Sequence, residues 1–283
     1  MEPCLVFDIE TVPDISGLRR LHDFPETLPD DDVLTAVTTT RRQAGQGGYG
    51  GGSDFLPHHL QRVVAISCVL RAGDKLAVWS LGNPDDHESV LIQRFFELFD
   101  RYTPQVVSWN GSGFDFPVLH YRSLIHGLSA SRYWDWGDDD RDFKFNNYLN
   151  RYHTRHIDLM DLLAQFQARA YAPLDAMAKL CGLPGKLGMD GSQVWGAYRR
   201  GEIAEIRAYC ETDVVNTYLL YLRFMVMRGV LDAPAHAEEL ALVRKRLAEL
   251  PEIPWAEYLR QWEIGGLYQR GTPREAKPDL VSE

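Results

Sequence analysis

The order of the predicted elements constrains the fold of this chain more than any other feature of its sequence. Three runs rich in β-forming residues come first, over 5–11, 62–70 and 75–81. An amphipathic helix is predicted over 88–101, where apolar residues recur at helical spacing, and a short apolar strand follows over 105–109. A β-β-β-α-β order followed by a helix-rich half is typical of an α/β protein.

This order predicts a ribonuclease H-like fold, a mixed β-sheet flanked by helices that carries its chemistry at the centre of the sheet. A last short strand is predicted over 156–159. We interpret the final helices, over 235–250 and 255–262, as a C-terminal helical extension. Between the strand and the extension, helices are predicted over 160–168, 174–181 and 203–228.

Composition excludes several classes of protein. The 283 residues, 45% of them hydrophobic, are enough to bury a sizeable core. No apolar run approaches the ~18 residues of a membrane span, and the N-terminus lacks the features of a signal peptide, so we expect a cytoplasmic protein with no membrane partner. The four cysteines lie far apart and form no C-x-x-C pair, which argues against a zinc site and a disulfide framework.

The net charge bears on nucleic-acid binding. A formal charge of -10 argues against a protein that coats nucleic acid, because that mode depends on many Lys and Arg contacts to phosphate. The charge is compatible with an enzyme that gathers acids at a metal site and meets phosphate through bound cations and a local basic rim.

The segment over 25–53 shows no periodicity and is predicted to be a long loop. Within it, residues 45–50 match the dinucleotide pattern G-x-G-x-x-G, but the required strand before it and helix after it are both missing. We therefore interpret residues 41–56 as a flexible glycine-rich insertion. One hypothesis is that this loop, with Arg41 and Arg42, closes over a substrate.

Two acids one residue apart lie at the end of the first strand. Because side chains along a strand alternate between its two faces, Asp8 and Glu10 project from the same face. Adjacent carboxylates repel each other and are costly to bury, so a fold that holds them together usually supplies a cation. The alternative is a strand that simply ends in a polar turn.

A third acid lies at a predicted strand-to-helix turn over 110–117. Ser112 is the predicted N-cap, and Asp115 falls in the first helical turn, where unpaired N–H groups and the helix dipole favour a negative charge. Acids are also common at this position for helix stability alone.

The fourth acid lies on the long helix predicted over 203–228. Tyr209 and Asp213 are four residues apart and therefore lie on one face of that helix, beside an apolar surface. An acid that faces the core is costly unless a positive charge pairs with it.

The segment over 129–155 is rich in aromatic and charged residues, Trp134 and Trp136 among them. Aromatic side chains interleaved with bases can stack on single-stranded nucleic acid. However, five aspartates crowd the same segment, and a packed surface loop is the alternative. Asp158 and Asp161 lie near the end of the last strand, where Asp158 can support the site indirectly, and Lys186 is either a phosphate contact or a solvated lysine.

Three segments together resemble a known superfamily. The sequences F-D-I-E-T over 7–11, N-G-S-G-F-D over 110–115 and Y-C-E-T-D over 209–213 resemble the three motifs of the DEDD 3'-5' exonucleases, in the tyrosine subclass. The histidine subclass has His five residues before the last Asp, and position 208 is Ala. More narrowly, residues 4–228 are similar to the predicted exonucleases related to the proofreading domain of family B DNA polymerases.

Phosphodiester hydrolysis explains why four carboxylates are needed. Two metal ions together activate a water, neutralise the nonbridging oxygens and stabilise the leaving oxygen. Four carboxylates balance two divalent cations, and all-oxygen ligands suit Mg²⁺ or Mn²⁺. The resemblance implies that Asp8 bridges both ions, that Glu10 and Asp213 complete the ion on the nucleophile side, and that Asp115 holds the second ion largely through water. It also implies that Tyr209 orients the attacking water.

The resemblance further implies a substrate pocket and a direction of cleavage. The backbone of Thr11 would contact the terminal 3' hydroxyl, and Asn110 and Phe114 would shape the pocket for the terminal nucleotide. We therefore expect a stand-alone 3'-5' exonuclease that releases nucleoside monophosphates from single-stranded 3' ends, with DNA favoured over RNA.

Three alternatives remain open at this point. They are an exoribonuclease with the same site, a nonenzymatic nucleic-acid-binding module on an exonuclease fold, and a structural protein whose acids only cap helices. The expected organisation is an exonuclease domain over 1–230, a helical extension packed on it over 231–265 and a flexible tail over 266–283.

Overall fold

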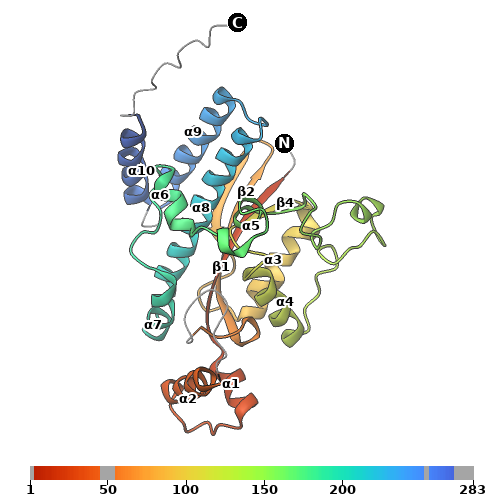
Figure 1. Cartoon of the computed structure of the whole chain (residues 1–283), viewed down its shortest axis with the longest axis vertical. Helices are drawn as coiled ribbons and strands as arrows, with labels where there is room; N and C mark the ends of the chain where they lie inside the picture. The colour runs from red at the N-terminus through yellow and green to blue at the C-terminus, as the bar shows by residue number, and fades with distance from the viewer. Residues whose placement is uncertain (1–2, 45–54, 252–254, 271–283) are drawn as a thin grey trace, which may run out of the picture.

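The computed structural model of the chain describes residues 3–44, 55–251 and 255–270. Its centre is a five-stranded sheet of order β3-β2-β1-β4-β5 (Figure 1). β1 pairs antiparallel with β2 and parallel with β4, and β5 is parallel to β4. This mixed sheet confirms the predicted ribonuclease H-like architecture. The strands are β1 Cys4–Pro13, β2 Gln61–Ala72, β3 Lys75–Ser80, β4 Gln105–Ser108 and β5 His156–Asp158.

β1 is the middle strand, and its side chains divide between two hydrophobic cores. Phe7 belongs to the core on one face of the sheet, and Val6 belongs to the core on the other. Because side chains alternate along a strand, Asp8 and Glu10 lie on the same face as Val6. The pairing of β1 with β2 skips Val64 between the partners of Glu10 and Thr11, and this irregularity bends the strand next to the two acids.

Two helices cover the face of the sheet that carries Phe7. They are α3 Glu88–Tyr102 and α4 Asp115–His126, which lie together on one side of the strands in Figure 1. The ring of Phe7 lies 4.7 Å from that of Phe95 and 4.9 Å from that of Phe116, measured between centroids. Burial of each such aromatic side chain stabilises the fold by about 1.5–3 kcal/mol, so this cluster fixes where α4 begins relative to β1.

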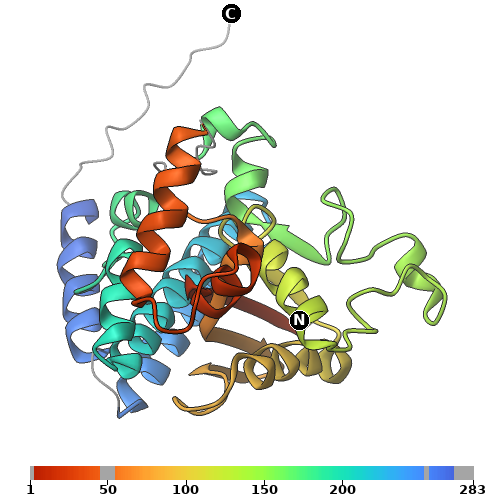
Figure 2. The same cartoon turned by 90° about the horizontal axis from the view of Figure 1, so that it is seen from below.

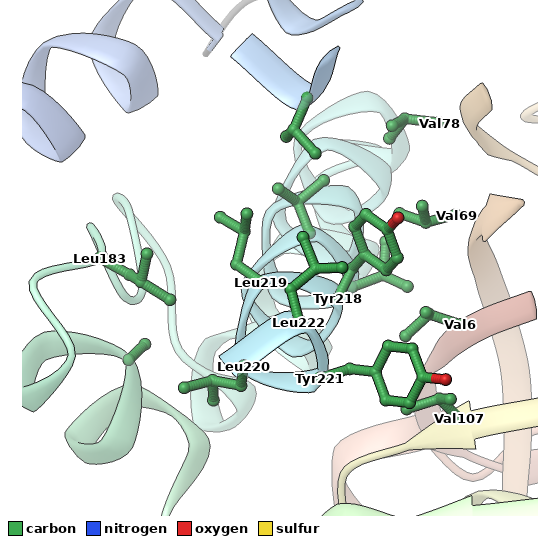
Figure 3. Packing of buried hydrophobic residues seen from close by; sticks show 14 of the residues in the cluster. Val6, Val69, Val78, Val107, Leu183, Tyr218, Leu219, Leu220, Tyr221 and Leu222 are labelled. Carbon is green, nitrogen blue, oxygen red and sulfur yellow. The ribbon is translucent and has the colours of Figure 1, made fainter. Parts of the chain in front are cut away.

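The opposite face is covered by α8 Ile203–Met227. Figure 3 shows Tyr218, Tyr221 and Leu222 of this helix beside Val6 and Val107 of the sheet. The Tyr221 hydroxyl donates a hydrogen bond of 2.6 Å to Gln105 at the start of β4. This packing sets the rotation of α8, and with it the direction in which Tyr209 and Asp213 point.

The C-terminal helices α9 Ala233–Glu249 and α10 Trp255–Arg270 pack beyond α8. Arg71 of β2 and Glu239 of α9 form an ion pair of 2.6 Å, and the Tyr218 hydroxyl donates to the same carboxylate at 3.1 Å. Helix α10 continues past the predicted helix end at 262, and residues 271–283 of the predicted tail lie outside the described part of the chain.

The prediction of a long loop over 25–53 is wrong. Helix α2 Asp30–Gln43 follows α1 Ile15–His22, and the two lie together at one end of the molecule (Figures 1 and 2). Leu18 of α1 and Val33 and Val37 of α2 form a small separate core, which supplies the burial that a helix of weak periodicity needs. The dinucleotide-like pattern and most of the predicted glycine-rich insertion fall on residues 45–54, outside the described residues.

The remaining helical elements are short, and the helix predicted over 160–168 ends early. It stops at Leu163 because Gln165 and Phe166 both have positive φ angles, which interrupt the helix. In the described part of the chain, no helix is long and apolar enough to cross a membrane. These elements are η1 His58–Leu60, η2 Arg141–Lys144, α5 Leu159–Leu163, η3 Ala168–Ala170, α6 Leu174–Leu180, η4 Gly191–Gln193 and α7 Val194–Arg199.

Candidate active site

The four acids singled out in the sequence come together where β1, α4 and α8 meet. Burial and the negative charges of Asp115, Glu10 and Asp213 raise the pKa of Asp8 well above its usual value. Burial and the charge of Asp213 likewise raise the pKa of Glu10. The polar-turn alternative does not fit this arrangement, because Glu10, Asp115 and Asp213 are buried and gather around the half-buried Asp8.

Asp115 is tied to the middle strand. One of its carboxylate oxygens, Oδ1, accepts a hydrogen bond of 3.2 Å from the backbone N–H of Ile9, and the side chain is 4% exposed. Burial and the charge of Asp158 raise the pKa of Asp115 to about 7, although the hydrogen bond from Ile9 opposes the shift. A first-turn acid present only for helix stability would face solvent, whereas this one faces Asp8.

On α8, Asp213 and Tyr209 lie on the face that packs against the sheet. Asp213 is 5% exposed, and among the described residues its Oδ1 has no hydrogen-bond partner. Burial raises the pKa of Asp213 to about 6, and the charge of Lys186 counteracts that shift. Tyr209 lies beside the Asp213 carboxylate, and burial together with the nearby acids raises the pKa of its phenol above the usual value.

The ammonium group of Lys186 lies close to the acids. The sequence left two interpretations of this lysine open, a phosphate contact and a solvated side chain. Its ammonium lies 5.2 Å from the centre of the Tyr209 ring and 4.0 Å from Asp213 Oδ2. The loop that carries it is held by Asp175, which accepts the backbone N–H of Lys186 at 2.8 Å. Lys186 is therefore directed at the acids and is not merely solvated.

Cys210 is a neighbour of the acids that the sequence analysis did not place in the site. Its thiol lies 3.6 Å from Asp8 Oδ2 and 3.4 Å from the backbone oxygen of Asp8. Cys210 and Asp213 are three residues apart on α8, and this spacing was the available signal, because such residues share a helix face. The thiol is fully buried, and burial raises its pKa well above the usual value.

The turn before α4 is held by Asp158, and Ser112 is not its N-cap. Phe114 occupies the N-cap position without a side-chain hydrogen bond, and the helix begins at Asp115. The two carboxylate oxygens of Asp158 accept the backbone N–H groups of Asn110, at 2.9 Å, and Ser112, at 2.8 Å. Asp158 therefore supports the site indirectly, as the sequence had indicated, by fixing the turn from which Asp115 projects.

The three residues predicted to contact substrate lie around this turn and the end of β1. Asn110 adopts a left-handed conformation with φ of 69°, and the ring of Phe114 lies 5.6 Å from those of both Phe55 and His58. The Thr11 hydroxyl donates to Gln61 at 3.2 Å, which leaves its side chain occupied within the fold. Their roles toward a nucleotide stay predictions.

The donor set fits divalent cations. Asp8, Glu10 and Cys210 present ligand atoms that all lie within 4.8 Å of one another. The carboxylates are buried without enough positive charge to balance them, and Asp213 Oδ1 is left without a partner among the described residues. A buried acceptor of this kind is costly unless a cation or a proton meets it. Carboxylate oxygens are the ligands preferred by Mg²⁺ and Mn²⁺.

Comparison with known proteins identifies related chains. Residues 53–262 match a family described as predicted 3'-5' exonucleases related to the exonuclease domain of PolB. This match starts after β1 and continues past the predicted end of the exonuclease domain at 230. It therefore includes α9 and part of α10, and it leaves Asp8 and Glu10 outside.

Two polymerases are among the curated relatives. The chain is 27% identical over 146 residues to the catalytic polypeptide of DNA polymerase epsilon from Saccharomyces cerevisiae, a match that covers 50% of this chain and 6% of the relative. It is 24% identical over 164 residues to a DNA polymerase of Archaeoglobus fulgidus, covering 54% of this chain and 20% of the relative. The chain thus corresponds to a small part of the length of these polymerases.

Among solved structures, the family B DNA polymerase of Pyrobaculum calidifontis aligns with 98% of this chain and 31% of its own, with 16% identity and a TM-score of 0.46. The family match is the stronger finding, because it spans most of the chain. The chain belongs to the family of predicted 3'-5' exonucleases related to the exonuclease domain of PolB.

Proposed function

We propose that the protein is a metal-dependent 3'-5' exonuclease that hydrolyses the terminal phosphodiester bond of single-stranded DNA and releases nucleoside monophosphates. The observation that carries the proposal is the meeting of Asp8, Glu10, Asp115 and Asp213, from three separate elements, in one cluster where burial and the neighbouring acids raise the pKa values of Asp8 and Glu10. Family membership supports the polarity of cleavage, which the geometry alone does not define.

The metal ligands of this proposal are the four carboxylates. Asp8 lies at the centre of the cluster, because its pKa responds to all three of the other acids, and this favours it as the residue shared between two cations. The charge of Asp213 helps to raise the pKa of Glu10, and Lys186 lowers the pKa values of both acids, which favours a common ion for that pair. Bound Mg²⁺ or Mn²⁺ ions supply the activation of water and the neutralisation of the phosphate and leaving oxygens.

The other residues position the reactants. The phenol of Tyr209 stays protonated at neutral pH because burial and the nearby acids raise its pKa, so it orients the attacking water through its hydroxyl and does not remove the proton. Lys186, directed at Asp213 and Tyr209, places a positive charge where a phosphate approaches the acids. Asn110 and Phe114, at the turn before Asp115, border the position of the terminal nucleotide, and the Thr11 backbone meets its 3' hydroxyl.

The test is a digestion panel with Mg²⁺ and Mn²⁺, using 3'- and 5'-labelled single- and double-stranded DNA and RNA. We expect mononucleotide release from the 3' end of single-stranded DNA by the parent protein. Asp8→Ala and Asp213→Ala should abolish release while circular dichroism shows an intact fold, and Tyr209→Phe should cause a large but incomplete loss of kcat. Full activity in Asp8→Ala would disprove the assignment.

The same panel separates the alternatives. Cleavage of RNA in place of DNA identifies an exoribonuclease with this site. Thermal melting at increasing metal concentration tests the alternatives in which the protein is not an enzyme. We expect Mn²⁺ to raise the melting temperature of the parent protein and to have a smaller effect on Asp8→Ala, whereas acids that only cap helices give no metal-dependent gain.

A further inference from the structure

A cavity of about 610 Å³ opens beside the candidate active site, on the far side of the turn that precedes Asp115. Asn110, Ser112 and Gly113 of that turn form one wall, and Trp134 and Trp136 from the 129–155 segment form another. The turn is thus shared by the cavity and the acid cluster. We call this space the tryptophan cavity.

The two tryptophans are held in place although their rings are exposed. Trp134 and Trp136 are 43% and 59% exposed, and they flank Asp135, which is 6% exposed. The Asp135 carboxylate accepts backbone N–H groups from the four residues 137–140, at 2.8 to 3.4 Å, so the loop around the rings is fixed from within. The Trp134 ring also lies 4.8 Å from that of His120. Exposed aromatic rings on a rigid support are suited to stacking.

The cavity offers hydrogen bonding, and the guanidinium of Arg151 on its wall is already paired with Asp161. Among the described residues, Nε2 of His120 has no hydrogen-bond partner, and burial lowers the pKa of this imidazole to about 4, so it is neutral at physiological pH. The two acids that line the cavity already have partners. Asp161 accepts hydrogen bonds from Arg151 at 2.5 Å and Tyr171 at 2.9 Å, and Asp158 holds the turn.

Charge decides which part of a nucleic acid can enter. The loop that carries the tryptophans, residues 132–145, holds five aspartates against three basic residues, and this net negative charge disfavours phosphate. A nucleobase is uncharged, presents a flat face to an aromatic ring and offers donors and acceptors at its edge. The cavity therefore suits a base and not the backbone.

We propose that the tryptophan cavity binds an unstacked nucleobase of the strand whose 3' end lies at the acids. This inference rests on the proposed function. It names single-stranded nucleic acid as the substrate class, because a base that is paired in a duplex is not free to enter the cavity. The cavity thus provides a binding contact to a nucleotide other than the terminal one. It also gives a role to the two exposed tryptophans, whereas Tyr133, Phe143 and Tyr148 of the same segment are buried in the hydrophobic core.

The experiment compares two substrates in the full chain. One is a single-stranded oligonucleotide of ten residues, and the other is a thymidine 5'-monophosphate aryl ester, which has no second base. For Trp134→Ala and Trp136→Ala we expect KM for the oligonucleotide to rise by about 10-fold, with kcat changed less, since stacking contributes on the order of 1–3 kcal/mol per base. The ratio of kcat/KM for oligonucleotide over ester should fall accordingly. The matched control is Phe145→Ala, because Phe145 is 77% exposed on the same segment and does not line the cavity.

A binding measurement makes the result independent of turnover. In the Asp8→Ala background, titration with oligonucleotides of DNA and of RNA should quench tryptophan fluorescence, and the quenching should shrink when Trp134 is replaced. An unchanged KM and unchanged quenching in both tryptophan variants overturn the inference, as does an equal loss on both substrates. If the parent protein cleaves neither substrate, the proposed function fails, and the titration alone decides whether the cavity binds a base.

Discussion

The Asp115 carboxylate accepts the backbone N–H of Ile9 at 3.2 Å, so α4 is joined to β1 at the residue that separates Asp8 from Glu10. This hydrogen bond fixes the position of Asp115 relative to Asp8 and Glu10. It also holds a buried carboxylate close to two others. Without bound cations, the repulsion between these carboxylates therefore lowers the free energy of unfolding, and the size of this effect depends on pH.

Asp115→Asn should stabilise the metal-free protein at neutral and alkaline pH. Because the fold raises the pKa of Asp115 to about 7, the native state holds a proton that the unfolded chain loses near pH 4. The parent therefore loses stability as pH rises from about 4 to about 7, and the Asn variant, which can still accept the Ile9 N–H, loses less because the other raised acids remain. We expect a gain on the order of 1–3 kcal/mol at pH 8 with EDTA, measured by urea denaturation.

The matched control for that measurement is Asp100→Asn, because Asp100 is an exposed acid on α3. Its effect should be close to zero at both pH 5 and pH 8. A stability difference between Asp115→Asn and the parent that is the same at pH 5 and pH 8 would contradict the linkage argument. Activity of Asp115→Asn should fall at least ~100-fold, because a metal ligand is lost.

Lys186→Met should move the acidic limb of the pH–rate profile. The lysine lowers the pKa values of Asp213 and Glu10, so its removal raises both, and a higher pH is then needed to ionise the metal ligands. We expect the acidic limb of kcat/KM to shift upward. Lys179→Met is the control, because Lys179 is an exposed lysine paired with Asp175 on α6, and it should leave the limb in place.

Arg122→Met should destabilise the protein strongly. Arg122 is 3% exposed and binds both Asp14, at 2.6 Å, and the buried carboxylate of Glu88. Removal of the guanidinium leaves two buried acids without their cation, which costs about 3–5 kcal/mol. Arg94→Met, which removes a half-exposed pair of 3.9 Å, should cost less than about 1 kcal/mol. Equal denaturation midpoints for the two variants would refute this account.

Gly111→Ala should disturb the turn before α4. A Cβ at this position would lie 2.3 Å from Ser108 Oγ and 2.6 Å from Ser108 Cβ, so the turn or Ser108 has to shift. We expect a loss of about 1–3 kcal/mol in the free energy of unfolding, together with reduced activity. Gly191→Ala meets nothing within 4 Å and serves as the control, with a thermal melt as the readout.

The sequence predicted the sheet and most of the acid cluster because both follow from local patterns. The alternation of side chains along a strand places Asp8 and Glu10 on one face of β1. Helical spacing places Tyr209 and Asp213 on one face of α8, and neither prediction depends on the rest of the chain. The strands and α3, α4, α8 and α9 were likewise found from periodicity to within a few residues. The approach of these elements to one another could be seen only in the three-dimensional structure.

What the sequence did not show depends on contacts between distant residues. Asp158 holds the backbone of Asn110 across nearly fifty positions, and nothing near Ser112 signals that its N–H is already taken. Helix α2 was missed because its β-branched threonines weaken the helical pattern, and its stability comes from packing on Leu18 of α1. The direction of Lys186 depends on Asp175, eleven residues earlier.

The placement of the last acid on α8 has a consequence during synthesis of the chain. A ribosome delivers β1 before α8, so the strands of the sheet have emerged before the helix that carries Asp213. Until α8 docks across β1, Asp8 and Glu10 have no Asp213 beside them and face open water. We therefore expect the nascent chain to be inactive toward nucleic acid until α8 has docked and the proposed active site is complete.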